Sequence, residues 1–296
     1  MAIEVTEQQA DHVSAAIRVS VPDKGLKQDL RAVSIVWRRE LIRFRSDRLR
    51  AVTSLVQPVL FLFVLGTGLS ALASRGMPSG VDFKTFIYPG VLSMSVLFTA
   101  IFSAASIVWD REFGFLREML VAPVSRAAIV IGKCLGGATV STFQGIVILA
   151  LAGLAGVPYD PVLFLTVIGE LLLLSFTLTA FGVMMAARIK QIQAFMALTQ
   201  MLVMPLFFLS GALYPLNGLP TWLTVLTRFD PLTYIVDPMR HAVFSHLNIP
   251  PGTVAALSPG VTWAGWHVPI GLSLGIVALM GATMLGVAIM EFQRTE

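Results

Sequence analysis

The chain has 296 residues, of which 56% are hydrophobic and 13% are charged, and its mean hydropathy is +0.80. A soluble domain carries roughly 25% charged residues, so this composition excludes an ordinary globular protein and indicates a polytopic membrane protein. The isoelectric point of about 9.5 is compatible with nucleic-acid binding, but the positions of the basic residues, described below, argue against it. Cys134 is the only cysteine, so an intrachain disulfide is excluded.

An amphipathic helix is predicted near the amino terminus. Residues 1–27 are polar, and we expect them to be disordered or loosely ordered. From 29 to 48, apolar residues recur at helical spacing and arginines occupy the remaining faces. This pattern is typical of a helix that lies in the membrane interface, although a basic juxtamembrane segment that only sets topology has the same composition. Its notable residues are Trp37, Arg38, Arg39, Leu41 and Phe44.

Six apolar runs follow, each near the ~20 residues that a helix needs to cross a bilayer. The runs lie at about 51–73, 85–108, 127–155, 162–186, 194–214 and 267–290. The third and sixth runs carry small residues at intervals of four, which is typical of close helix packing in membranes. We expect most of them to pack within one subunit. They include Gly132, Gly136, Gly271, Gly275 and Gly286.

The distribution of lysine and arginine predicts the orientation of the spans. With a cytoplasmic amino terminus, seventeen of the 21 basic residues fall on the cytoplasmic side and four fall outside. Cytoplasmic loops of membrane proteins carry the excess of such residues. All five tryptophans fall at predicted boundaries between membrane and water. We therefore expect a multi-pass protein of the cell membrane with both termini cytoplasmic.

The longest segment outside the spans, about 215–265, is predicted to be external. Asp230 and Pro231 form an N-cap and N1 pair that predicts a helix, and Pro238 is expected to kink or end it. A second short apolar helix precedes this one, and such a pair suggests a re-entrant hairpin that dips into the outer leaflet. We expect the hairpin at 215–246 and an exposed loop at 247–262.

A charged island separates the second and third spans. Residues 110–126 carry six formal charges, whereas the flanking runs carry almost none. Phe113, Leu116 and Leu120 recur at helical spacing, and Pro123 ends the pattern because it disfavours helical backbone at the preceding residue. Ser125 can then cap the next helix. The island is predicted to hold a short amphipathic helix, at 111–121, that serves as a cytoplasmic docking element.

The sequence holds no evident catalytic or metal-binding constellation. The four histidines are scattered. The phosphate-binding pattern G-x-x-x-x-G-K-[ST] is missing, since Gly132 and Lys133 are followed by Cys134. We therefore expect no enzyme activity, no cofactor and no metal in this chain.

Glu170 is an acidic residue well inside a predicted span. An intramembrane carboxylate is energetically unfavourable and suggests a function, such as binding a cationic group of a substrate or carrying a proton. The alternative is a protonated or hydrogen-bonded packing residue, and no second buried charge is evident to form a relay. Candidate residues along a substrate path are Glu170, Gln200 and Asp237.

Four stretches, in the right order, resemble ABC-2 type transporter permeases, most closely the daunorubicin-resistance branch of multidrug exporters. Residues 111–126, REFGFLREMLVAPVSR, resemble the first cytoplasmic loop of that family. YPGVLSM, which begins at Tyr88, resembles the entry of that family's second span. SGALYP, which begins at Ser210, resembles the exit of its fifth span. DPLTY, which begins at Asp230, resembles its external hairpin, together with Asp237 and Arg240. The likeness covers about residues 28–290.

The resemblance implies an all-α, type V exporter-like permease with six spans, an elbow helix, a coupling helix and an external re-entrant hairpin. It implies two separate ATP-binding cassette ATPase subunits, which hold ATP and Mg, and a second permease copy, expected to be identical. The other partners are the lipid bilayer and an amphipathic substrate, not nucleic acid. The residues then expected to couple to the ATPase are Glu112, Phe113, Gly114, Phe115, Leu116, Arg117, Glu118, Met119 and Leu120.

The predicted function is export of an amphipathic or hydrophobic drug, lipid or glycoconjugate from the cytoplasm or inner leaflet. A secondary transporter would need buried ionisable relays or broken helices in an inverted repeat. A membrane-embedded enzyme would need a cluster of His, Asp and Glu at one interface. The sequence suggests neither, whereas a regulatory membrane subunit that does not transport is still an alternative.

Overall fold

The computed structural model describes residues 25–70, 81–115, 124–216, 218–247, 249–258, 260–263 and 265–294. The described chain is mostly helical, and six of its helices are long and apolar enough to cross a membrane: Ala51–Gly68, Phe83–Glu112, Arg126–Leu149, Pro161–Arg188, Ile192–Leu209 and Ile270–Arg294. The predicted all-α, six-span membrane fold is therefore confirmed. Of the expected loose amino-terminal segment, residues 1–24 lie outside the described part of the chain.

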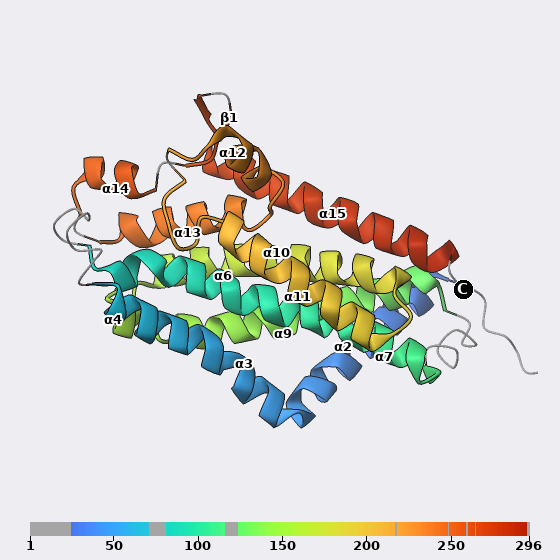
Figure 1. Ribbon diagram of the computed structural model, residues 1–296. Helices are drawn as coiled ribbons and strands as arrows, with labels where there is room; N and C mark the ends of the chain where they lie inside the picture. The colour runs from blue at the N-terminus through green and yellow to red at the C-terminus, as the bar shows by residue number, and fades with distance from the viewer. Residues whose placement is uncertain are drawn as a thin grey trace, which may run out of the picture.

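The spans form an elongated bundle (Figure 1). Its centre consists of α6 (Phe83–Ser103), α9 (Arg126–Leu149) and α10 (Pro161–Arg188). α7 (Ala105–Glu112) continues α6, and α15 (Ile270–Arg294) packs along α10. The apolar windows of the second and third spans are 78% and 72% buried, but those of the first and fifth are 17% and 22% buried. The first span and α11 (Ile192–Leu209) therefore present most of their apolar surface to lipid or to another subunit.

The helix expected at 29–48 is α2 (Leu26–Ser46), which begins and ends slightly earlier than predicted. It meets α3 (Arg48–Leu60) at Asp47, and the two helices form a V below the bundle in Figure 1. The first span then continues through a π-helical turn, η1 (Phe61–Leu65), and α4 (Gly66–Gly68).

Glycines of α9 permit α2 to pack closely against it. A Cβ on Gly132 would lie 2.8 Å from the Cβ of Val36, and one on Gly136 would lie 2.6 Å from the Cβ of Glu40. Packing of the third-span glycines within one subunit is therefore confirmed. The same expectation is wrong for most of the sixth-span glycines, because an added Cβ has no atom within 4 Å at Gly271, Gly275 and Gly286.

We expect Gly136→Ala to destabilise the docking of α2. The new methyl group would overlap the first carbons of the Glu40 side chain, so the helix itself must shift, and overpacking of this kind lowers stability by about 1–3 kcal/mol. Gly286→Ala is the matched control, since its surroundings are open. The measurement is the apparent Tm of both purified variants in the same detergent. Equal Tm values for the two variants would contradict this packing.

Two spans end before their predicted limits. α9 stops at Leu149 rather than 155, and a 3₁₀ helix, η2 (Ala152–Ala155), follows it. The Tyr159 hydroxyl donates to the exposed carbonyl of Ala150 (2.9 Å), which satisfies one unpaired group of this helix end. α11 stops at Leu209 rather than 214, because Gly211 has a left-handed backbone (φ 71°) that cannot continue a helix.

The segment between the fifth and sixth spans forms a cap at one end of the bundle, which we name the hairpin end (Figure 1). It contains α12 (Thr221–Thr227), α13 (Thr233–Ser245), α14 (Pro251–Leu257), and strand β1 (Thr262–Trp263) antiparallel to β2 (Trp266–His267). Two helices are present where a hairpin was expected, but α13 continues through Pro238 instead of ending there. The exposed loop expected at 247–262 is wrong, since α14 and β1 lie in it and Leu257 and Val261 pack into the core.

Two buried ionisable side chains hold α13 in place. The Asp230 carboxyl oxygen accepts a hydrogen bond from the Leu232 N–H (3.0 Å), and burial raises the pKa of Asp230 to about 8. The Arg240 guanidinium donates to the carbonyls of Gly211 (2.8 Å) and Ala212 (3.2 Å). It also lies 4.2 Å from the centroid of the Phe86 ring. Arg240 therefore ties α13 to the end of α11 and to the start of α6.

Candidate functional site

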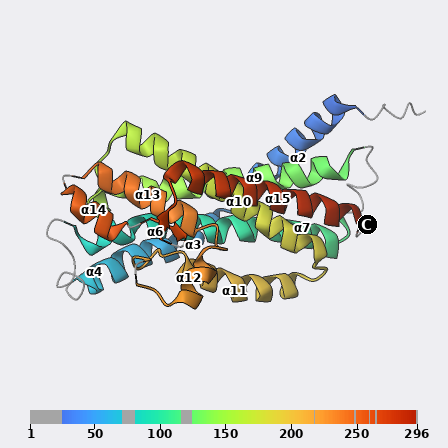
Figure 2. The ribbon, with the colours of Figure 1, turned by 90° about the horizontal axis from the view of Figure 1, so that it is seen from above.

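Ionic contacts concentrate at the opposite end of the bundle, which we name the charged end. It comprises α2, residues 109–112, the start of α9, the connection 189–191 and the last turns of α15. These elements, far apart in sequence, lie at the same end of the molecule in both ribbon views (Figures 1 and 2).

A buried cluster of three charges joins α2, α7 and α9. The ammonium of Lys133 on α9 lies 2.5 Å from the Asp110 carboxylate and 2.8 Å from the Glu40 carboxylate. The three side chains are only 2%, 5% and 9% exposed, respectively. Lys133 also donates to the Ser106 hydroxyl (3.1 Å), and Arg39 lies 3.0 Å from Asp110 on the more exposed side. Each buried carboxylate is thus paired, as buried charges require.

The next two residues of α7 contact the other spans. The Arg111 guanidinium donates to the carbonyls of Ala186 (2.9 Å) and Ile189 (2.7 Å) at the end of α10. The Glu112 carboxylate accepts a hydrogen bond from the Ile192 N–H (2.9 Å) at the first position of α11. An anion is favourable there because the first N–H groups of a helix lack partners and the helix dipole is positive at that end.

The far side of the charged island is also tied to the bundle. The Ser125 hydroxyl accepts from the Ala128 N–H (3.2 Å), so the predicted cap of the third span is confirmed. The Ser125 N–H donates to the Asp29 carboxylate of α2 (3.0 Å). Arg126 donates to the carbonyl of Gln293 near the end of α15 (3.0 Å). Both ends of the island are therefore held by other elements of the charged end.

The structure corrects the start of the helix predicted at 111–121. α7 ends at Glu112, and Gly114 adopts a left-handed backbone (φ 82°), so no continuous helix runs through this point. Phe113 and Phe115 are 70% and 54% exposed, which leaves two aromatic side chains open to a partner. The other expected coupling residues, Leu116, Arg117, Glu118, Met119 and Leu120, lie outside the described residues, and their role is still a prediction.

The expected elbow residues divide between two faces of α2. The Trp37 indole N–H donates to the Thr139 hydroxyl of α9 (3.1 Å), and Phe44 packs edge-on against Phe143 (6.4 Å between centroids). Arg39 joins the buried cluster, whereas Leu41 is half-buried and Arg38 is exposed. The face that packs most tightly on α9 is a different one, formed by Ala32, Val36 and Glu40.

The residues proposed along a substrate path are not brought together as a set. Glu170 is buried on α10, and one of its carboxylate oxygens has no hydrogen-bond partner within the described structure. Asp237 on α13 is close enough to act on Glu170 electrostatically, and it accepts a hydrogen bond from the Ser258 hydroxyl (2.8 Å). Gln200, in contrast, is exposed on α11. The three candidate residues therefore do not form one site.

Six apolar helices in one bundle, with buried charges at one end, define the class as a multi-pass membrane protein. The chain matches the family model described as ABC-2 type transporter over residues 31–244, and it belongs to that family. Membership implies a partner ATP-binding subunit, as the resemblance predicted.

Similar proteins are named as transport permeases. The chain is 29% identical over 214 residues to the putative transport permease ycf38 of Cyanophora paradoxa, covering 72% of this chain and 73% of the relative. It is 28% identical over 225 residues to the inner membrane transport permease YadH of Escherichia coli strain K12, covering 74% and 85%. It is 30% identical over 160 residues to the probable multidrug ABC transporter permease YbhR of the same strain, covering 53% and 43%. The chain is thus a transport component and not an enzyme, as predicted.

Proposed function

We propose that this chain is the permease subunit of an exporter that moves an amphipathic or hydrophobic substrate out of the cytoplasm or the inner leaflet. Two copies pair with two ATPase subunits, which hold ATP and Mg. Both termini and the charged end face the cytoplasm of an inner membrane, in keeping with the seventeen basic residues on that side. The names of the relatives YadH and YbhR support the location and a drug-like substrate range.

The observation that carries this proposal is the set of contacts made by Asp110, Arg111 and Glu112. Through these residues the start of the charged island contacts α2 and α9, the end of α10, and the start of α11. An ATPase that pushes on the adjoining residues from Phe113 onward would therefore displace several spans together. Packed helices transmit such a displacement as rigid elements. The island then conveys motion, and the bundle moves the substrate.

Transport in vesicles tests this function. The permease is reconstituted in proteoliposomes with its ATPase partner, and uptake of the fluorescent amphiphile rhodamine 6G into inside-out vesicles is followed on addition of ATP. We expect uptake only when both proteins and ATP are present, and none with a hydrolysis-deficient ATPase. ATPase binding without uptake would instead indicate a regulatory subunit. Uptake driven by an ion gradient without the ATPase would indicate a secondary transporter.

A further inference from the structure

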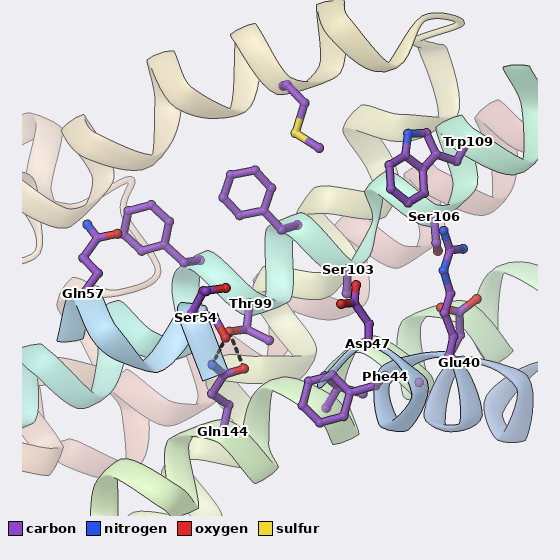
Figure 3. Close-up of a pocket in the computed structure, with 18 of the residues that line it drawn as sticks. Glu40, Phe44, Asp47, Ser54, Gln57, Thr99, Ser103, Ser106, Trp109 and Gln144 are labelled. Carbon is purple, nitrogen blue, oxygen red and sulfur yellow. Dashed lines mark hydrogen bonds between the residues drawn. The ribbon is translucent and has the colours of Figure 1, made fainter. Parts of the chain in front are cut away.

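A cavity of about 450 Å³ lies between α2, α3, α6 and α9 (Figure 3), and its lining does not include Glu170, Gln200 or Asp237. This volume is in the range of sites that hold drug-sized molecules. Met196 of α11 also contributes to its lining. The cavity is thus built by the elbow helix and four spans of one subunit.

Aromatic side chains form much of the wall. Phe44 comes from α2, and Phe98 and Phe102 come from successive turns of α6, with their rings stacked at 6.2 Å between centroids and 10° between planes. Trp109 lines the cavity at the charged end. Flat aromatic walls favour offset stacking or edge contacts with a ligand that itself contains rings.

Polar groups line the interior of the cavity as well. The Thr99 hydroxyl donates to the side-chain oxygen of Gln144 (3.0 Å), whose amide in turn donates to the Ser54 hydroxyl (Figure 3). A glutamine amide has two N–H groups, so the second can donate to a ligand. Gln57 adds another amide.

The position of the cavity fixes its depth in the membrane. Asp47 marks the corner between α2 and α3, and Ser54 lies seven residues further into the span, roughly 10 Å at 1.5 Å per residue. The charged side chains that line the cavity, Glu40, Arg43 and Asp47, belong to α2 and this corner. The cavity therefore runs from a charged mouth to an aromatic and amide-lined interior within one leaflet.

We propose that this cavity binds a ring-containing amphiphile with hydrogen-bonding groups on its body, which enters from the cytoplasmic leaflet. This inference rests on the proposed function: the cavity is the site at which the permease binds its substrate before export. An acyl chain of a bilayer lipid fits less well, because it cannot form hydrogen bonds with the amides of Gln57 and Gln144. Polar groups left unpaired in an apolar site are unfavourable.

Binding to the permease alone tests the cavity. Rhodamine 6G, which has a planar ring system and two N–H groups, is titrated against the full-length permease in lipid nanodiscs without ATPase, with fluorescence anisotropy as the readout. Thr53→Trp fills the cavity from an exposed position of the lining, and Gln144→Leu removes the interior amide. Val56→Trp is the matched control, since Val56 is 49% exposed on the same helix and is not part of the lining.

We expect saturable binding that weakens at least tenfold in both cavity variants and is unchanged in Val56→Trp. Elution as a single species in size-exclusion chromatography checks that each variant is folded. Equal affinities in the cavity and control variants, or no saturable binding, would overturn the proposal. So would a fluorescent lysophosphatidylcholine whose binding, unlike that of the dye, is lost in Thr53→Trp. The binding assay contains no ATPase, so it is independent of the export assay. Dye binding that depends on the cavity, without ATP-driven export, would contradict the proposed function alone. ATP-driven export, with dye binding that the cavity variants leave unchanged, would contradict this inference alone.

Discussion

Replacing Lys133 with methionine is expected to lower the free energy of unfolding by about 3–5 kcal/mol, which is typical when one partner of a buried ion pair is removed. The change leaves Glu40 and Asp110 buried with no ammonium between them. Asp110 keeps Arg39 at 3.0 Å, so Glu40 is the group most affected. We expect the docking of α2 on α9 to loosen and the apparent Tm in detergent to fall by roughly 10 °C.

Lys190→Met is the matched control for this experiment, since it makes the same chemical change at an exposed position of the α10–α11 connection. Adding Glu40→Gln to Lys133→Met should recover part of the loss, because the amide needs no counter-charge. The two residues are in contact, so the double variant should deviate from additivity by about 0.5–3 kcal/mol. A Tm for Lys133→Met equal to that of the control would show that the three charges contribute nothing to docking.

The charged cluster is better explained by specificity than by stability. Buried ion pairs are weak evidence for stability, since apolar residues of similar volume often do as well. A charged side chain accepts few alternative positions, however, because any shift of α2 along α9 would separate Glu40 from Lys133. The glycines at 132 and 136 permit close approach, and the ion pair selects one register. If α2 moves together with the spans, as proposed above, it needs such a fixed register.

The spans could be predicted from sequence because hydropathy and length decide whether a helix crosses a bilayer. Their ends were predicted less well, since they depend on local contacts that hydropathy does not record. The hydrogen bond from Tyr159 to the end of α9 and the left-handed Gly211 after α11 are examples. The structure of residues 247–262 was missed for a related reason. Its Pro and Gly residues suggested an exposed loop, but its few apolar residues pack into the core.

The packing face of α2 could not be read from its apolar pattern. In water an apolar face marks the core, but in a membrane apolar side chains can equally face lipid, and Leu30 of the apolar pattern is 61% exposed. The true packing face carries Glu40 in register with Ala32 and Val36 at intervals of four. The available signal was Lys133, a cation inside an apolar run, since a buried charge needs a partner of opposite sign. Glu40 would therefore have been a better candidate for a functional residue than Gln200.

Charge reversal at Glu112 is expected to uncouple ATP hydrolysis from transport while leaving membrane insertion intact. Glu112→Lys removes the acceptor for the Ile192 N–H and places a cation at the positive end of α11. A lost charge-assisted hydrogen bond accounts for about 1.5–3 kcal/mol, and each 1.4 kcal/mol is tenfold in an equilibrium constant. We therefore expect ATP-driven uptake to fall at least tenfold, and the stimulation of ATPase activity that accompanies transport to fall equally. The same reversal at Glu118, nearer the middle of the island, is predicted to act in the same direction.

Glu112→Gln separates the mechanical role of this contact from its charge. The amide oxygen still accepts from the Ile192 N–H, so the connection from α7 to α11 persists without the favourable charge. If this connection transmits motion, Glu112→Gln keeps most of the uptake and Glu112→Lys loses it, with equal amounts of both variants in the membrane fraction. If Glu112→Lys transports and stimulates ATPase activity like the unmodified protein, the path from the island into α11 carries no force, and coupling must enter the bundle through the contacts of Asp110 and Arg111 instead.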